Sequence, residues 1–192
     1  KDLRSILSQQ MEYCYFPVRE CELAATINYH QLKEGESVQV GTAKVTSIVT
    51  NHPVLNFGYK VEEDDKKFFF TGDYEPPANI YDIEDEEYDN YQELINDQQM
   101  LLVDFIKDAD VMIADSQYTM TEYPTKKGWG HGTFETNIEL ARVAKVKQLH
   151  FTHHDPTRTD DQLDAIFAEV MSRDNLPETE FLLAKEGTII DL

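Results

Sequence analysis

The chain has 192 residues, of which 41% are hydrophobic and 28% charged, as in a soluble globular protein with a sizeable core. Its 37 acidic and 17 basic residues give a net charge of −20, which argues against extended binding to nucleic acid and against anionic membranes. No apolar run approaches the length of a membrane span. A small substrate held at a metal stays compatible with this charge, because the metal supplies local positive potential.

The first part of the chain predicts a helix followed by a strand. Residues 2–13 carry apolar side chains at helical spacing, and residues 22–32 are typical of a strand. The spacing of Cys14 and Cys21 fits neither a redox pair nor a zinc knuckle. We therefore expect buried free thiols and a reducing compartment, hence a cytoplasmic location.

The next part predicts strands and then an acidic segment. Residues 38–50 predict one or two strands, and residues 57–63 and 66–72 predict a hairpin joined by an acidic turn. Residues 82–97 are dense in acids and tyrosines and predict an acidic loop or helix insertion. Their spacing does not match a calcium-binding loop, although a basic protein partner could dock there.

Helices and strands alternate over the rest of the chain. The pattern predicts, in order, a helix over 100–109, a buried strand over 110–115, a helix over 132–145 capped by Thr133, a strand over 146–152, a helix over 159–174 capped by Thr159, and a strand, turn and strand over 179–192. Strands followed by this alternation predict a single α/β domain over residues 1–192, built as a sandwich of sheets covered by helices.

Metal-ligating residue types follow several of the predicted strands. His52 comes before Pro53, Asp73 comes directly after an apolar strand and a glycine, and His153 ends the strand over 146–152. An Asx turn is the alternative interpretation of Asp73 taken alone. Imidazole and carboxylate together suit zinc, manganese or iron, and an aspartate can bridge two cations. A hydroxide held between two metals is a potent nucleophile, so the pattern points to hydrolysis.

Four stretches in order resemble the metallo-β-lactamase superfamily, specifically its ribonuclease Z-like and phosphodiesterase-like branch: "NHPVLNFGYKVE", "KKFFFTGDYEP", "DADVMIADSQYTMTEY" and "GWGHGTFETNIELARVAKVKQLHFTHHDP". The resemblance covers most of the chain. It implies a four-layer αββα sandwich, here incomplete at the N-terminal side, and two divalent metal ions, zinc first, with manganese or iron as alternatives.

The resemblance also implies a role for each matching residue. His52 would bind the first metal, Asp73 would bridge both, and His153 would bind the second. His131 would act as general acid or stabilise charge on phosphate, and Asp115 would orient His131. If the strand that ends at His153 stays regular, His154 points to the opposite face.

The chain also departs from the family pattern. The HxHxDH motif, which supplies most of the ligands, is absent from the 192 residues, so we expect the chain to be the later part of a longer protein. Asp115 stands where Glu is more usual. With so few ligands, the chain by itself is expected to bind metal weakly and to be nearly inactive.

The expected substrate is a small, nucleotide-like phosphodiester, because the charge is unsuited to a transfer RNA and a leaving alkoxide benefits from a proton donor such as His131. A homodimer is one possible assembly. The alternative is a non-catalytic binding or signalling module on the same fold, since one fold hosts many functions.

Overall fold

The structure is a computed structural model that describes residues 2–173 and 178–190. The chain divides into two compact units, Lys1–Lys33 and Glu34–Leu192, which are described separately below. The predicted single domain over 1–192 stays a prediction.

The first unit contains little regular structure. Helix α1 (Leu3–Gln10) begins after Asp2, whose side chain accepts a hydrogen bond from Ser5 N, and a 3-10 turn, η1, covers Glu20–Glu22. The strand predicted over 22–32 is wrong, because among residues 2–173 and 178–190 no strand pairs with this segment. Cys14 and Cys21 are free, as predicted, but both are exposed rather than buried.

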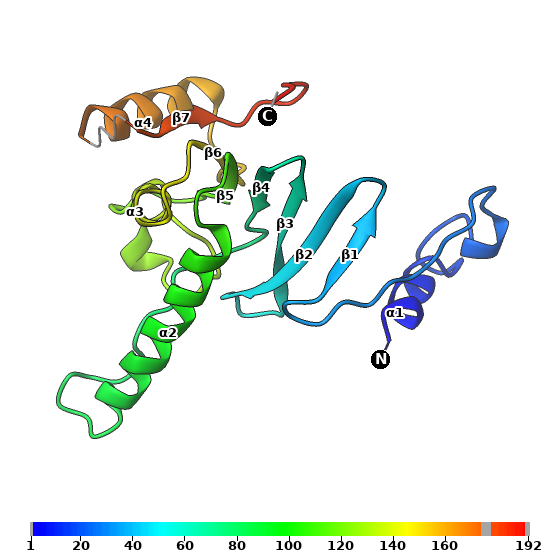
Figure 1. Cartoon of the computed structure of the whole chain (residues 1–192), viewed down its shortest axis with the longest axis horizontal. Helices are drawn as coiled ribbons and strands as arrows, with labels where there is room; N and C mark the ends of the chain where they lie inside the picture. The colour runs from blue at the N-terminus through cyan, green and yellow to red at the C-terminus, as the bar shows by residue number, and fades with distance from the viewer. Residues whose placement is uncertain (1, 174–177, 191–192) are drawn as a thin grey trace. The chain divides into compact units, whose positions relative to one another are not determined.

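The second unit is built on one seven-stranded sheet whose strands lie in sequence order (Figure 1). Its strands are β1 (Ser37–Val40), β2 (Ala43–Thr50), β3 (Asn56–Glu63), β4 (Lys66–Phe70), β5 (Val111–Asp115), β6 (Gln148–Thr152) and β7 (Glu180–Leu183). Strands β1 to β4 pair antiparallel, and β4 to β7 pair parallel. The α/β class predicted from the sequence is confirmed.

Local sequence explains the hairpins. Asp64 and Asp65 join β3 to β4 with φ angles of 48° and 64°, the left-handed pair that a two-residue hairpin turn requires. The predicted hairpin is therefore confirmed. At the end of the chain only β7 forms; described residues 188–190 are not a strand, and residues 191–192 of that prediction lie outside the described residues.

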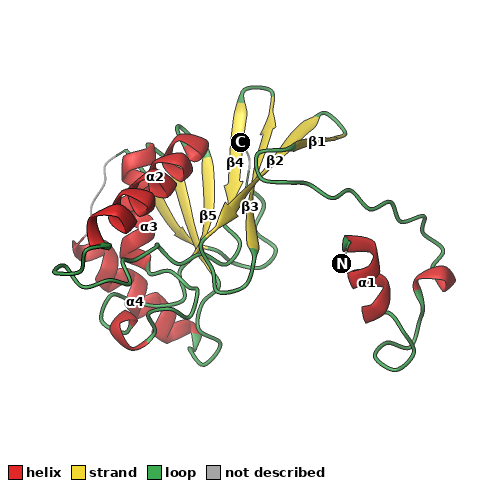
Figure 2. Ribbon diagram, turned by 90° about the horizontal axis from the view of Figure 1, so that it is seen from below, coloured by secondary structure: helices red, strands yellow, loops and turns green. Residues whose placement is uncertain are grey.

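Three helices cover one face of the sheet (Figure 2). They are α2 (Tyr88–Ile106), α3 (Phe134–Ala144) and α4 (Asp160–Arg173). Alternate strand positions supply the sheet side of the core, including Phe69, Met112, Leu149 and Phe151, all with no exposed surface. On the other face, Tyr59 and Phe70 are each 40% exposed. The described residues thus account for one sheet and one helical layer of the expected sandwich.

The helix starts follow their capping residues. Thr133 accepts a hydrogen bond from Thr136 N at the start of α3, and Thr159 accepts one from Gln162 N before α4, as predicted. Helix α2 is longer than predicted, because it begins at Tyr88 and takes in the second half of the acidic stretch 82–97.

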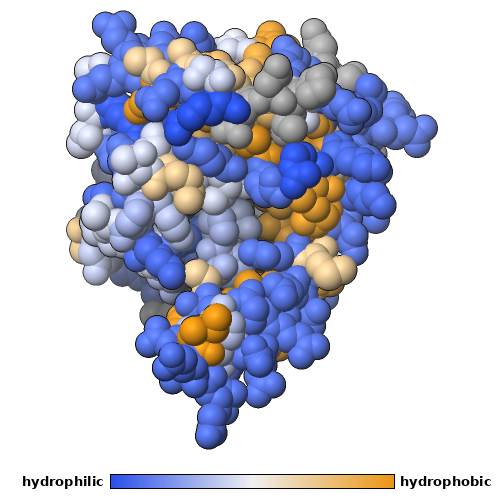
Figure 3. All heavy atoms as spheres, turned by 90° about the vertical axis from the view of Figure 1, so that its left-hand side faces the viewer, coloured by the Kyte–Doolittle hydropathy of each residue, from blue (hydrophilic) through white to orange (hydrophobic). Residues whose placement is uncertain are grey.

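Hydrophilic side chains cover most of the surface shown in Figure 3, and apolar ones gather in a few patches. Over the part of the chain that is described, none of the helices is long and apolar enough to cross a bilayer.

Candidate active site

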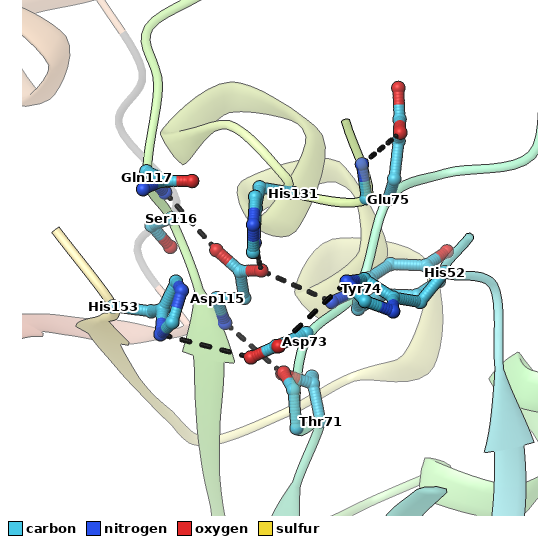
Figure 4. Close-up of polar contacts among 12 residues, drawn as sticks. His52, Thr71, Asp73, Tyr74, Glu75, Asp115, Ser116, Gln117, His131 and His153 are labelled. Carbon is cyan, nitrogen blue, oxygen red and sulfur yellow. Dashed lines mark hydrogen bonds and ion pairs between the residues drawn. The ribbon is translucent and has the colours of Figure 1, made fainter. Parts of the chain in front are cut away.

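Four of the predicted residues meet because their strands run in one direction. Strand β2 is antiparallel to β3, and β3 is antiparallel to β4, so β2 runs the same way as β4, β5 and β6. The carboxyl ends of these strands share one edge of the sheet. That edge carries His52, Asp73, Asp115 and His153, as Figure 4 shows.

Asp73 lies between two histidines. Its Oδ2 atom is 3.8 Å from His52 Nε2, and its Oδ1 atom is 3.7 Å from His153 Nδ1. The Asp73 backbone carbonyl accepts hydrogen bonds from Asn56 Nδ2 at 2.7 Å and from Thr50 Oγ1 at 3.2 Å. These two bonds fix the segment after β4, so the carboxylate is directed at both imidazole rings.

His52 presents one ring nitrogen to this carboxylate. Its Nδ1 atom lies 2.8 Å from the Val54 carbonyl, which can only accept a hydrogen bond. The Val54 N–H lies farther from the same nitrogen, at 3.2 Å, so the shorter contact favours a proton on Nδ1. The lone pair of Nε2 is then directed toward Asp73 and is free to bind a cation.

The two histidines after β6 separate because the strand stops at Thr152. His153 has a φ of 56°, in the left-handed region, and its side chain is directed at Asp73. The ring of His154 instead stacks on Phe134, at 5.9 Å between centroids. Only His153 of the pair therefore faces the site. The cause is this backbone bend, and not the alternation of side chains along a regular strand.

Asp115 holds His131 through a short hydrogen bond. His131 Nδ1 donates to Asp115 Oδ2 at 2.8 Å. The same oxygen accepts from Tyr74 N at 3.1 Å, and Oδ1 accepts from Gln117 N at 3.2 Å. Burial raises the pKa of the Asp115 carboxyl, and the hydrogen bonds from His131 and Tyr74 oppose that effect.

His131 reaches the strand edge from the glycine-rich loop before α3. Its ring stacks on the ring of His153, at 4.8 Å between centroids, and meets the His52 ring edge-on at 5.7 Å. Gly130 allows this close packing: its φ is 96°, and a Cβ there would lie 2.2 Å from His52 Cδ2. The structure therefore brings all five predicted residues together, while their roles stay predictions.

The donor set fits a divalent cation. Asp73, Asp115, His131 and His153 place one ligand atom each within 4.8 Å of one another, and His52 adjoins them through Asp73. Both oxygens of Asp115 already accept hydrogen bonds from the protein. His52, Asp73 and His153 are consequently the better candidates for ligands, since imidazole and carboxylate are the donors that zinc, manganese and iron accept.

Sequence reasoning missed two residues that support the site. Asn56 holds the Asp73 carbonyl, and nothing in the local pattern singled it out. Glu75 is only 4% exposed and accepts hydrogen bonds from the loop that carries His131. The sequence could have indicated Glu75, because this acid lies two residues after the candidate ligand Asp73 and directly before Pro76 and Pro77.

The fold and the site together define an α/β protein of the metallo-β-lactamase type, with a histidine and carboxylate centre at its strand ends. A family model described as "Beta-lactamase superfamily domain" matches residues 1–154, and the chain belongs to this family.

Curated relatives and solved structures agree with that assignment. The chain is 25% identical to ribonuclease Z of Thermoplasma volcanium, over 91% of this chain and 66% of that protein, and 22% identical to ribonuclease BN of Cronobacter sakazakii, over 74% and 56%. The metallo-β-lactamase fold protein YhfI from Bacillus subtilis aligns with a TM-score of 0.59 at 17% identity, over 83% of this chain and 54% of that one. The short form of human tRNase Z aligns with a TM-score of 0.50 at 18% identity, over 80% and 44%. The chain thus spans 66% or less of the length of each of these four proteins.

Proposed function

We propose that this chain forms part of a metal-dependent hydrolase that cleaves a small phosphodiester. His52 and His153 would each hold one of two divalent cations, zinc first, and Asp73 would contact both. Bound cations would supply positive charge beside the phosphoryl group and lower the pKa of a water molecule. The arrangement of His52 Nε2 and His153 Nδ1 on opposite oxygens of Asp73 supports this assignment.

The observation that carries the proposal is the His131–Asp115 pair beside the candidate ligands. Asp115 holds Nδ1, so Nε2 is the atom that can carry a transferable proton. The buried carboxylate stabilises the ring when both nitrogens are protonated. In the proposed step the oxygen of a water molecule forms a new bond to phosphorus, the bond to the leaving oxygen breaks, and His131 donates its Nε2 proton to that oxygen. Ester cleavage needs such a donor, because an alkoxide is a poor leaving group.

Charge favours a small substrate. The net charge of −20 repels a long polyanion, whereas one phosphate can be neutralised locally by cations. The names of the curated relatives, ribonuclease Z and ribonuclease BN, favour RNA as the second candidate substrate. Free thiols at Cys14 and Cys21 support our proposal of a cytoplasmic location.

One assay separates these candidates. The whole protein that contains this chain is incubated with zinc or manganese and, in turn, with a chromogenic phosphodiester, a cyclic nucleotide, the matching phosphomonoester and a transfer RNA. We expect turnover of the diesters, and a fall in kcat of roughly 10²–10⁴-fold in His131→Ala with metal content unchanged. Cleavage of RNA alone would support the second candidate, and no turnover of any substrate would support a non-catalytic binding module.

The isolated chain should behave differently from the whole protein. Three candidate ligands shared by two cations are fewer than tight zinc sites use. We therefore expect weak zinc binding and little hydrolysis by these 192 residues. Calorimetric titration checks this: tight binding of two zinc ions per chain would contradict the expectation.

A further inference from the structure

Glu75 is a buried acid whose carboxylate lies outside the candidate ligand set. It is 4% exposed. Its Oε1 atom accepts hydrogen bonds from Tyr123 Oη at 2.6 Å and Gly128 N at 2.7 Å, and its Oε2 atom accepts one from Gly130 N at 2.6 Å. All three donors belong to the loop that precedes His131. Figure 4 shows Glu75 beside the site with its carboxylate bonded to this loop.

The backbone of Glu75 is tied to a second part of the site. Its N–H donates to the Asn51 carbonyl at 2.9 Å, and its carbonyl accepts a hydrogen bond from Asn51 Nδ2 at 2.9 Å. Asn51 directly precedes His52, and Asp73 lies two residues before Glu75. One residue therefore connects the segments that carry His52, Asp73 and His131.

The chemistry of these contacts requires a carboxylate. Three donors converge on two oxygens, and a carboxylate offers acceptors only. No salt bridge reaches Glu75 among residues 2–173 and 178–190, so hydrogen bonds alone compensate for the burial of its two carboxyl oxygens. Burial and Glu75 raise the pKa of the Tyr123 hydroxyl, which keeps it protonated as a donor. Buried carboxyl oxygens are costly unless they accept hydrogen bonds, so the loop must stay where its three donors reach them.

The loop position determines where His131 lies. Gly130 packs so closely on the His52 ring that a Cβ could not fit, and His131 is the next residue. We propose that Glu75 is a positioning residue: it clamps the loop from Tyr123 to Gly130 so that the His131 ring faces the metal-ligand cluster. This inference rests on the proposed role of His131 as proton donor.

The clamp itself can be tested without any substrate. Glu75→Gln keeps the shape of the side chain but turns one acceptor into an NH₂ donor that opposes the loop amides. Trp129 is the single tryptophan of the chain, lies in this loop and is 57% exposed, so it reports loop position directly. In Glu75→Gln we expect lower Trp129 fluorescence anisotropy and hydrogen exchange of the Gly130 amide that is roughly 10–100-fold faster.

Two further variants keep the outcome decisive. Glu93→Gln makes the same chemical change at an exposed position of α2 and should leave both signals unchanged. Tyr123→Phe removes one of the three donors and should change both signals in the same direction but by less. This variant still tests the clamp if Glu75→Gln does not fold. Unchanged Gly130 exchange and Trp129 anisotropy in the Glu75 variant would overturn the clamp.

Kinetics of the whole protein then decide whether the clamp acts through His131. We expect Glu75→Gln to lower kcat by roughly 10–100-fold with KM within about twofold, as for a misplaced catalytic group. In a His131→Ala background the same change should have almost no further effect. If the fall in kcat of the double variant equals the product of the falls in the two single variants, Glu75 does not act through His131. An inactive wild-type protein would refute the proposed hydrolase, while the exchange and fluorescence results would still decide the clamp.

Discussion

Asp115 has no exposed side-chain surface, and its Oδ2 atom lies 2.8 Å from Nδ1 of His131, whose ring is 16% exposed. The pair therefore joins a buried carboxylate to an imidazole at the edge of the site. The carboxylate fixes which nitrogen of the ring faces the candidate ligands, because the other nitrogen is hydrogen-bonded.

Asp115→Asn should disable the site without removing its candidate metal ligands. The amide cannot accept from His131, Tyr74 and Gln117 together, so one buried N–H loses its partner, at a cost of about 1–3 kcal/mol. His131 also loses the charge that stabilises its protonated ring. We expect kcat to fall about as far as in His131→Ala, roughly 10²–10⁴-fold, with zinc content unchanged. Wild-type turnover in the asparagine variant would contradict the proposed pairing.

Asp73→Ala should remove metal binding rather than proton donation. Zinc that binds only the folded protein raises the unfolding temperature, and the rise grows with the logarithm of the ratio of free zinc to its dissociation constant. Because Asp73 faces both His52 and His153, its loss should abolish that zinc-induced rise, whereas His131→Ala should retain it. Thermal unfolding of the whole protein with and without zinc measures the difference. An equal zinc effect in the two variants would exclude Asp73 as a shared ligand.

Gly130→Ala should disturb the site more than Gly128→Ala does. Both glycines have positive φ angles, 96° and 85°, so alanine costs about 1–2 kcal/mol at either position. Only the Gly130 Cβ would overlap the His52 ring; at Gly128 nothing lies within 4 Å. We expect weaker zinc binding and greater loss of stability for Gly130→Ala. Chemical denaturation and zinc titration of both variants test this, and equal effects would argue against the close packing.

Asp110→Asn should destabilise the fold in a pH-dependent way. Asp110 is 9% exposed; burial alone would raise its pKa, but hydrogen bonds from Lys147 Nζ and Lys67 N outweigh burial and lower it. Because the pKa of Asp110 is lower in the folded protein than in the unfolded chain, its ionised carboxylate stabilises the fold above a pH of about 3.9, the pKa in the unfolded chain. This contribution is lost as the pH falls further and the carboxylate becomes protonated. We expect the variant to lose about 1–2 kcal/mol at pH 7 and less at pH 3.

Urea denaturation at both pH values measures this difference. Asp97→Asn, at an exposed position of α2, is the matched control and should change stability little at either pH. A destabilisation by Asp110→Asn that is the same at pH 3 and pH 7 would contradict the role of its charge.

Local sequence predicted much of the second unit because its signals act over a few residues. Thr133 and Thr159 cap helices where expected, and the acidic turn at Asp64 and Asp65 closes the predicted hairpin. The strand predicted over 22–32 failed for the opposite reason. A strand needs a partner, and an isolated segment carries no information about whether one is present.

The sequence by itself determined the residue types of the candidate site and their position at strand ends, since apolar runs that stop at His52, Asp73 and His153 can be read along the chain. Tertiary structure decided which side chains meet. The shared strand direction places the carboxyl ends of β2, β4, β5 and β6 at one edge of the sheet. The left-handed backbone at His153 directs this histidine, rather than His154, into the site. Glu75 reaches across to the glycine-rich loop before α3. These contacts join residues far apart in the chain, and only the packed sheet specifies them.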